Sequence, residues 1–219
     1  MSTQTSSLKR ASAFSIAALA ILVCAIVAGL GEPIAGQEQF ETLSDPAAYS
    51  ALLAATGPRL RWVLYIDTLF ALSYTAAVGF AALAYYGRNR AVALVSGVSI
   101  IIVMLLDFVE NATMAHSLDL VGLQGQVTLE MIQHQATISA AKWHLAAATL
   151  FTVSFLLPDE TLPEKLLVWG ARLGLPFAVP AFLFDPSGLR EMGGLLLLIS
   201  MSGGLLLLAI TAGARARSG

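Results

Sequence analysis

Residues 91–116, AVALVSGVSIIIVMLLDFVENATMAH, decide the class of fold. No charged side chain occurs before Asp107, and an apolar run of about 18 or more residues is long enough to cross the hydrocarbon of a bilayer. Asp107, Glu110 and Asn111 then stand at the end of this run, where lipid is expected. Because charged groups in hydrocarbon need polar partners, the stretch predicts a membrane helix whose polar end packs against other helices.

The composition of the whole chain agrees with a membrane protein. Of the 219 residues, 57% are hydrophobic and 12% are charged, whereas about a quarter of the residues in a soluble domain are charged. The formal net charge of -2 and the lack of a long basic stretch argue against nucleic acid as a partner. Because Cys24 is the one cysteine, an intrachain disulfide is excluded. We expect a single membrane domain, residues 1–219, with the lipid bilayer as its partner.

Six apolar segments meet or approach the length that a membrane span requires. They cover residues 12–30, 60–86, 91–116, 130–157, 164–184 and 193–213. The first segment follows Lys9 and Arg10, as in a secretory signal peptide, but its apolar core is longer than that of most signal peptides. This length favours a retained helix. The sequence therefore predicts an all-α fold, a polytopic bundle of six transmembrane helices.

The distribution of basic residues predicts which way this bundle faces. With a cytoplasmic N-terminus, the inner connections and tails carry Lys9, Arg10, Arg88, Arg90, Lys165, Arg215 and Arg217. The outer connections carry Arg59, Arg61 and Arg190. Basic loops stay on the cytoplasmic side, so both termini are expected there, as tails of residues 1–11 and 214–219. The expected location is the cytoplasmic or inner membrane of a bacterium.

The first outer loop, residues 31–59, is expected to contain a helix of its own. It includes the stretch SDPAAYSALLAATGP. Ser44 or Asp45 can cap a helix and Pro46 suits its first turn, whereas Gly-Pro at the end of the stretch is a stop signal. The pattern predicts a short helix that lies on the outer membrane face.

Three of the predicted spans carry ionisable side chains, each set on one helical face. The candidates for a polar site are Asp67 and Tyr74 on the second span, Asp107, Glu110 and Asn111 on the third, and Lys142 on the fourth. At about 1.5 Å per residue, the four charged side chains lie roughly 6–13 Å below the outer surface. Spans that alternate in direction thus bring their charges to a similar depth.

Energetics predict that these charged faces turn toward one another. Each Asp or Lys at the centre of a lipid-facing helix costs about 2.5–3.5 kcal/mol. Lys142 is the one cation at this depth and cannot neutralise three carboxylates. We therefore expect that at least one carboxyl is protonated at neutral pH, or that a cation or a ligand amine binds there.

This polar cluster favours a membrane protein that binds a small molecule or an ion, and a proton-coupled carrier in which Asp107 and Glu110 titrate. One alternative is an intramembrane enzyme that acts on a lipid or isoprenoid, with Asp107 or Glu110 as the acid and Lys142 or Tyr74 stabilising developing charge. A second alternative is a structural subunit of a larger membrane complex. The same residues also allow a purely structural interpretation, in which a buried ion pair fixes the helix register and has no other role.

Small residues at helical spacing indicate where helices approach one another closely. They are Ala17, Cys24 and Ala28 in the first span and Gly193, Ser200 and Gly204 in the sixth. Such faces also suit a second copy of the chain or another membrane subunit.

Metal ligation has little support in the sequence. Glu130 and His134 are one helical turn apart and His116 is expected near the same surface, so the residue types suit a metal. No motif of fixed spacing accompanies them, and Glu130 near a helix start is already favoured by the helix dipole. We predict neither a metal nor another cofactor.

Overall fold

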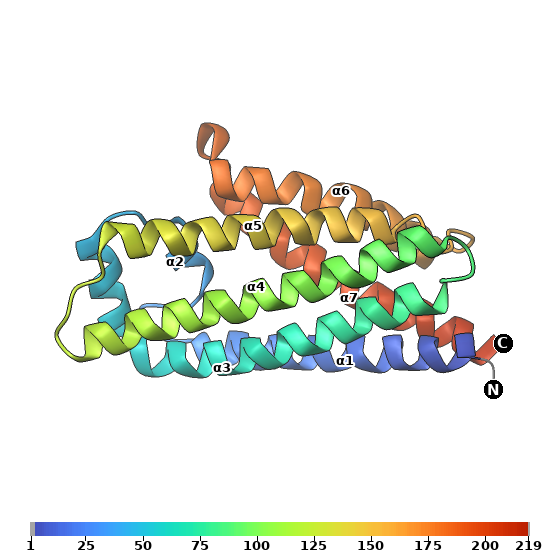
Figure 1. The fold of residues 1–219 in the computed structure, drawn as a ribbon, viewed down its shortest axis with the longest axis horizontal. Coiled ribbons are helices and arrows are strands. Elements are labelled where there is room, and N and C mark those ends of the chain that lie inside the picture. The colour runs from blue at the N-terminus through green and yellow to red at the C-terminus, as the bar shows by residue number, and fades with distance from the viewer. Residues whose placement is uncertain (1–2, 219) are drawn as a thin grey trace.

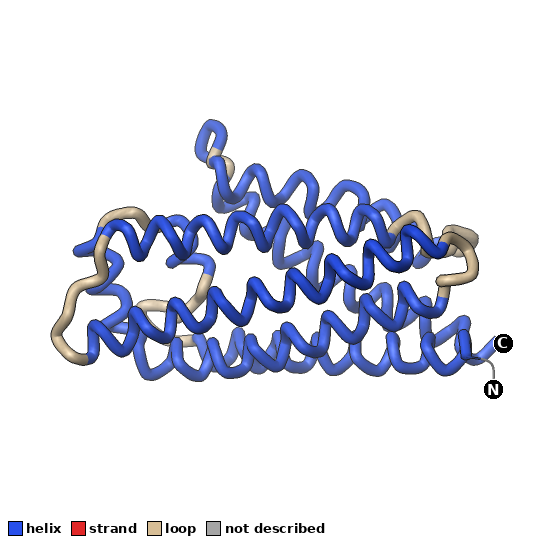
Figure 2. The backbone as a smooth tube through the Cα atoms, viewed as in Figure 1, coloured by secondary structure: helices blue, strands red, loops and turns tan. Residues whose placement is uncertain are grey.

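The computed structural model describes residues 3–218, and these form only helices and their connections. The long helices are α1 (Thr3–Gly29), α3 (Pro46–Ala84), α4 (Arg90–Gly122), α5 (Leu129–Val153), α6 (Leu162–Phe184) and α7 (Arg190–Ser218). The short ones are α2 (Glu38–Thr42) and the 3-10 turn η1 (Pro186–Gly188). Figure 2 shows how little of the chain lies in loops. The all-α prediction is confirmed for the described residues. Residues 1, 2 and 219, at the ends of the predicted tails, lie outside them.

The six long helices form a closed ring of neighbours. Going around it, α1 packs against α3, α3 against α4, α4 against α5, α5 against α6, α6 against α7, and α7 against α1. Figure 1 shows an elongated bundle with both chain ends at one end, which we call the terminal end. The other end, which we call the α2 end, carries α2 and the loop of residues 123–128.

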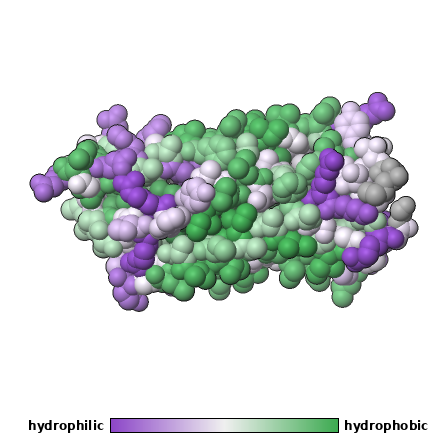
Figure 3. Space-filling view, turned by 90° about the horizontal axis from the view of Figure 1, so that it is seen from below, coloured by the Kyte–Doolittle hydropathy of each residue, from purple (hydrophilic) through white to green (hydrophobic). Residues whose placement is uncertain are grey.

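Five of the long helices, all except α5, are long and apolar enough to cross a membrane. The 25 residues of α5 would extend about 38 Å at 1.5 Å per residue, which is also sufficient length. Its composition is less apolar because its buried face carries Gln135, Ser139, Lys142 and Thr149. Figure 3 shows apolar side chains across the middle of one face of the bundle and polar side chains toward both ends. This distribution supports a multi-pass membrane protein.

Helix α3 differs from the prediction for the first outer loop. Asp45 caps it as expected, because its carboxylate accepts a 2.8 Å hydrogen bond from the backbone N–H of Ala48. The helix starts at Pro46 and continues through the predicted stop at Gly57 and Pro58. The prediction of a separate interfacial helix is therefore wrong. The loop helix that does exist is the five-residue α2, which precedes this stretch.

Packing explains why α3 does not stop at Pro58. A proline inside a helix removes one backbone hydrogen bond and strains the preceding turn, by about 3 kcal/mol. Leu53 and Leu60 flank it, and both are buried in one apolar core together with Phe40 and Tyr49. Burying a leucine side chain contributes on the order of 1.5–3 kcal/mol, so the tertiary contacts outweigh the local stop signal.

The small residues that α1 buries differ from those predicted. Its buried small residues include Ala11, Ser15 and Ala18, whereas Cys24 of the predicted stripe is exposed. On α7, Gly193 is buried, and a Cβ there would lie 2.5 Å from the backbone nitrogen of Phe182. The close approach predicted at Gly193 is thus present between α6 and α7, while the predicted stripe on α1 faces outward at Cys24.

Candidate functional site

The polar face of α5 places Lys142 inside the ring of helices. Thr128 caps the start of this helix, because its hydroxyl accepts a 3.3 Å hydrogen bond from the backbone N–H of Met131. Gln135, Ser139 and Lys142 then follow at the spacing of one helical face, and all are buried. Because the Lys142 residue is only 8% exposed, its ammonium needs partners in the protein.

Three acidic side chains surround the Lys142 ammonium. Nζ contacts the Glu110 carboxylate directly, and it lies 3.2 Å from Oδ1 of Asp107 and 3.6 Å from Oε1 of Glu41. An ammonium has three N–H donors, which matches the number of acids. Nζ also lies 4.7 Å from the centre of the Trp143 ring, within cation–π distance.

Asp107 and Glu110 have donors on both of their carboxyl oxygens. The hydroxyl of Tyr74, on α3, donates to Oδ2 of Asp107. The hydroxyl of Ser139, on α5, donates to Oε1 of Glu110, and Lys142 contacts the second oxygen of each acid. Each of the two acids therefore has a hydroxyl at one carboxyl oxygen and the Lys142 ammonium near the other.

Asn111, on α4 next to Glu110, forms hydrogen bonds with α3 and with the first loop. Its Nδ2 donates to Oδ2 of Asp67 at 2.9 Å and to Oγ1 of Thr68 at 3.3 Å. Its Oδ1 accepts from Nε2 of Gln37 at 2.5 Å. Glu41, Asp107 and Glu110 each form an ion pair with Lys142 in the described structure. Asp67 is the fourth acid nearby, and it forms no such pair among the described residues. Asp67 is also less buried than the other three.

The structure thus brings all six residues singled out from the sequence into one group. Together with Glu41, they form what we call the Lys142 cluster: Glu41, Asp67, Tyr74, Asp107, Glu110, Asn111 and Lys142. Helices α3, α4 and α5 supply six of the seven, as their helical faces predict, and α2 supplies the seventh.

Glu41 is the acid that sequence reasoning missed. The sequence presents it as an ordinary acid of the outer loop, but it is only 6% exposed. Its Oε2 accepts a 2.7 Å hydrogen bond from Nε1 of Trp143. Helical periodicity cannot place a loop residue in the bundle interior. The available signal was the neighbouring Phe40, the one aromatic side chain among residues 30–45.

Burial dominates the acid–base behaviour of Glu41, which lies outside the membrane-spanning helices. Loss of contact with water raises the pKa of its carboxyl from an ordinary value near 4.5 to about 7. Lys142 opposes this change by favouring the ionised form, whereas the negative charge of Glu110 adds to it. Glu41 therefore changes charge near neutral pH.

A second polar contact lies toward the α2 end, next to the cluster on α5. The hydroxyl of Tyr49 donates a 2.8 Å hydrogen bond to Oε1 of Gln135. Nε2 of Gln135 has no hydrogen-bond partner among the described residues, although the residue is 1% exposed. An unpaired buried donor costs about 1–3 kcal/mol, so this amide is available to an acceptor.

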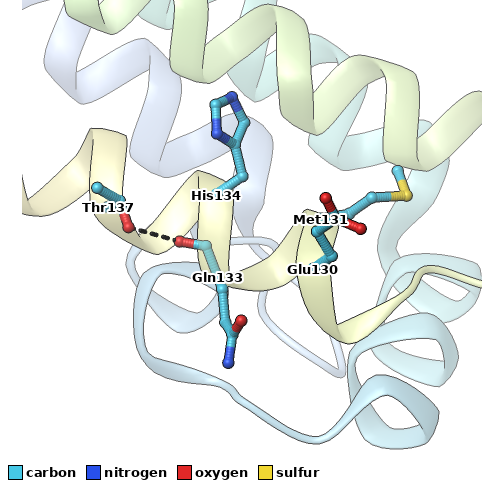
Figure 4. Close-up of a pocket in the computed structure, with 5 residues that line it drawn as sticks. All are labelled: Glu130, Met131, Gln133, His134 and Thr137. Carbon is cyan, nitrogen blue, oxygen red and sulfur yellow. Dashed lines mark hydrogen bonds between the residues drawn. The ribbon is translucent and has the colours of Figure 1, made fainter.

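The residues considered for a metal lie apart from the Lys142 cluster. Glu130 and His134 are exposed and line a cavity of about 540 Å³ near the start of α5. Figure 4 shows the His134 ring apart from the Glu130 carboxylate, with no hydrogen bond drawn between them. His116 is exposed on α4 and is not among the lining residues. Within residues 3–218, no group of three or more His, Cys, Asp or Glu side chains could hold a metal ion.

Comparison of the chain with protein-family models, with curated proteins and with solved structures finds no match. The fold and the site therefore define the class by themselves. The chain is an all-α, multi-pass membrane protein with a buried lysine surrounded by acids. Its function has to be inferred from the Lys142 cluster.

Proposed function

We propose that the protein is a membrane carrier of six spans, α1 and α3 to α7, whose Lys142 cluster binds protons together with a small cationic molecule. The observation that carries this proposal is the ratio of four acidic side chains to one ammonium in the cluster. Buried charges without partners are too costly to persist. The excess acids must therefore bind protons or another cation.

The contacts indicate which acids take up the protons. Asp107 and Glu110 have a donor on each oxygen and an ion pair with Lys142, which favours their ionised forms. Glu41 is farther from the ammonium, and Asp67 is not paired with it. We assign the protons to Glu41 and Asp67, rather than to Asp107 and Glu110 as the sequence suggested.

The orientation in this proposal follows the basic residues. Both chain ends lie at the terminal end of the bundle (Figure 1), in agreement with an even number of spans. The surplus of Lys and Arg in the tails and the connections at that end supports a cytoplasmic position for it. The α2 end, with the loop that carries Glu41, then faces the outside, and protons reach the cluster from there.

The same contacts weigh against the enzyme alternative. A general acid must be protonated and must reach the substrate within hydrogen-bond distance. Asp107 and Glu110, the candidate acids, are held by Tyr74, Ser139 and Lys142 in contacts that suit ionised groups. The subunit alternative has its own test: a partner chain that co-purifies in fixed stoichiometry from native membranes would support it.

The experiment that tests the carrier proposal uses purified protein in liposomes that enclose a pH-sensitive dye. A set of small quaternary ammonium ions, which have no neutral form that crosses a bilayer, is added outside, one at a time. A proton-coupled carrier should change the internal pH with at least one of them. Asp107→Asn, which removes an acid paired with Lys142, should abolish the change. Internal pH that responds equally in empty liposomes, or in liposomes with Asp107→Asn, would contradict the proposal.

A further inference from the structure

The segment between α1 and α3, residues 30–45, covers the Lys142 cluster at the α2 end. Figure 1 shows its helix α2 beside α5, and the two helices are in contact. Two of its side chains reach the cluster: Gln37 donates to Asn111, and Glu41 accepts from Trp143 and pairs with Lys142. The segment is therefore part of the site as well as its cover.

Contacts with the long helices hold this segment in place, among them hydrogen bonds from the Arg59 guanidinium on α3 to the carbonyls of Leu30 and Pro33 at 3.0 and 2.8 Å. Phe40 is fully buried, and its ring centre lies 5.2 Å from that of Tyr49 in an edge-on arrangement. Ala35 is 1% exposed, and its N–H donates to the carbonyl of Gly29 at 2.9 Å. Isolated helices much shorter than about 12 residues are not stable in water. The five residues of α2 thus depend on these contacts and on Glu41 for their position.

We infer that residues 30–45 are a lid on the Lys142 cluster, and that protonation of Glu41 closes this lid while ionisation of Glu41 favours its opening. The inference rests on the proposed function, because it states how the same site is reached from outside and what regulates that access. It adds a moving part and a pH dependence that the carrier proposal does not contain.

Proton linkage determines in which direction pH moves the equilibrium between the closed and the open lid. In the closed position the pKa of Glu41 is raised to about 7, whereas a carboxyl in water has an ordinary value near 4.5. The closed lid therefore binds the proton more tightly than the open lid. Between these two values, each unit by which the pH falls favours the closed lid by up to about tenfold. Above pH 7, ionised Glu41 carries the full penalty of its burial, and opening becomes more favourable.

The charged groups around Glu41 also affect which protonation state the closed lid favours. Lys142 on α5 attracts the ionised form, while Glu110 on α4 and Glu38 on α2 repel it. The Trp143 N–H donates to the carboxyl in the closed position, and a protonated carboxyl keeps an oxygen able to accept it. The loss of hydration is the largest influence, so removing the charge strengthens the closed position.

Quenching of Trp143 fluorescence tests the lid. Trp62→Phe and Trp169→Phe leave Trp143 as the one tryptophan, and both replaced residues are more than half exposed on the outside of the bundle. The protein is placed in lipid nanodiscs, and acrylamide, a neutral quencher in water, is added. We expect the quenching rate constant to fall about threefold or more as the pH is lowered from about 8.5 to about 5.5.

Two variants on α2 separate Glu41 from other titrating groups. Glu41→Gln is neutral and keeps an acceptor for Trp143, so its quenching should be low at every pH. Glu38→Gln changes an exposed acid of the same helix and should keep the pH dependence. Quenching that does not change with pH in the parent protein would overturn the lid. So would a pH dependence that survives in Glu41→Gln.

A third variant and the liposome assay keep the two proposals separable. Phe40→Ala removes the apolar anchor and should raise quenching at every pH, and unchanged quenching would count against the lid. Solute-driven pH changes in liposomes together with pH-independent quenching would reject the lid and leave the carrier. Quenching that follows pH as expected, in a protein that moves no protons, would reject the carrier and leave the lid.

Discussion

Nζ of Lys142 on α5 and Oδ1 of Asp107 on α4 lie 3.2 Å apart. Tyr74 holds the same carboxylate from α3, so three neighbouring helices of the ring meet at this ion pair. Glu110 and Glu41 complete the surroundings of the ammonium. Because Lys142 compensates several acids at once, its loss should affect all of them.

Replacement of Lys142 by methionine should leave expression intact and lower the free energy of unfolding by about 3–5 kcal/mol at about pH 8, because the remaining acids lose their shared partner. The difference from wild type should shrink as the pH falls, since the acids then bind protons. Thermal unfolding in detergent, at about pH 8 and at lower pH, measures the difference in stability between this variant and wild type. Lys142→Arg is the charge-preserving control. A difference that is constant with pH would show that the acids do not respond to the loss.

Asp67→Asn and Asp107→Asn should differ although the chemical change is the same. An amide replaces a protonated carboxyl with little loss of contacts and needs no proton from water, so Asp67→Asn should be at least as stable as wild type at neutral pH. Asp107→Asn removes the negative charge that pairs with Lys142, although the amide oxygen can still accept from Tyr74, and should cost about 2–4 kcal/mol. Unfolding in denaturant compares the two variants. Equal effects would contradict the assignment of the proton to Asp67.

The effect of Glu41→Gln on stability should depend on pH in a defined direction. The raised pKa of Glu41 means that the folded protein binds this proton more tightly than the unfolded chain. Stability is therefore lost as the pH rises from about 4.5 through about 7. The neutral variant lacks this loss, so it should match wild type near the lower value and unfold at a higher temperature above the upper one. The same ranking at every pH would contradict burial of the Glu41 charge as the cause.

The two chain ends should both lie in the cytoplasm. A reporter that is active only outside the cytoplasm, fused after residue 219, should be silent, and a fusion in the loop of residues 123–128 should be active. The reverse result would invert the bundle and place the Lys142 cluster on the cytoplasmic side.

Much of the fold and part of the site could be predicted from the sequence. The apolar runs and the 3.6-residue spacing identified the long helices and the faces that hold Asp67, Asp107, Glu110 and Lys142. Pro58 misled, because a local stop signal carries no information on the buried leucines around it. The burial of Glu41 could not be predicted for a similar reason. Its position depends on how the first loop folds back, and no periodic pattern in the sequence encodes that path.

The most direct test of the central claim counts protons. Wild type and the double variant Glu41→Gln, Asp67→Asn, each in lipid nanodiscs, are titrated in weakly buffered solution between about pH 8.5 and about pH 5, and the two curves are subtracted. Groups common to both proteins, including the three histidines, cancel in this difference. We expect wild type to bind between one and two more protons over this range, with the first taken up near pH 7. Curves that superimpose would mean that the cluster does not bind protons.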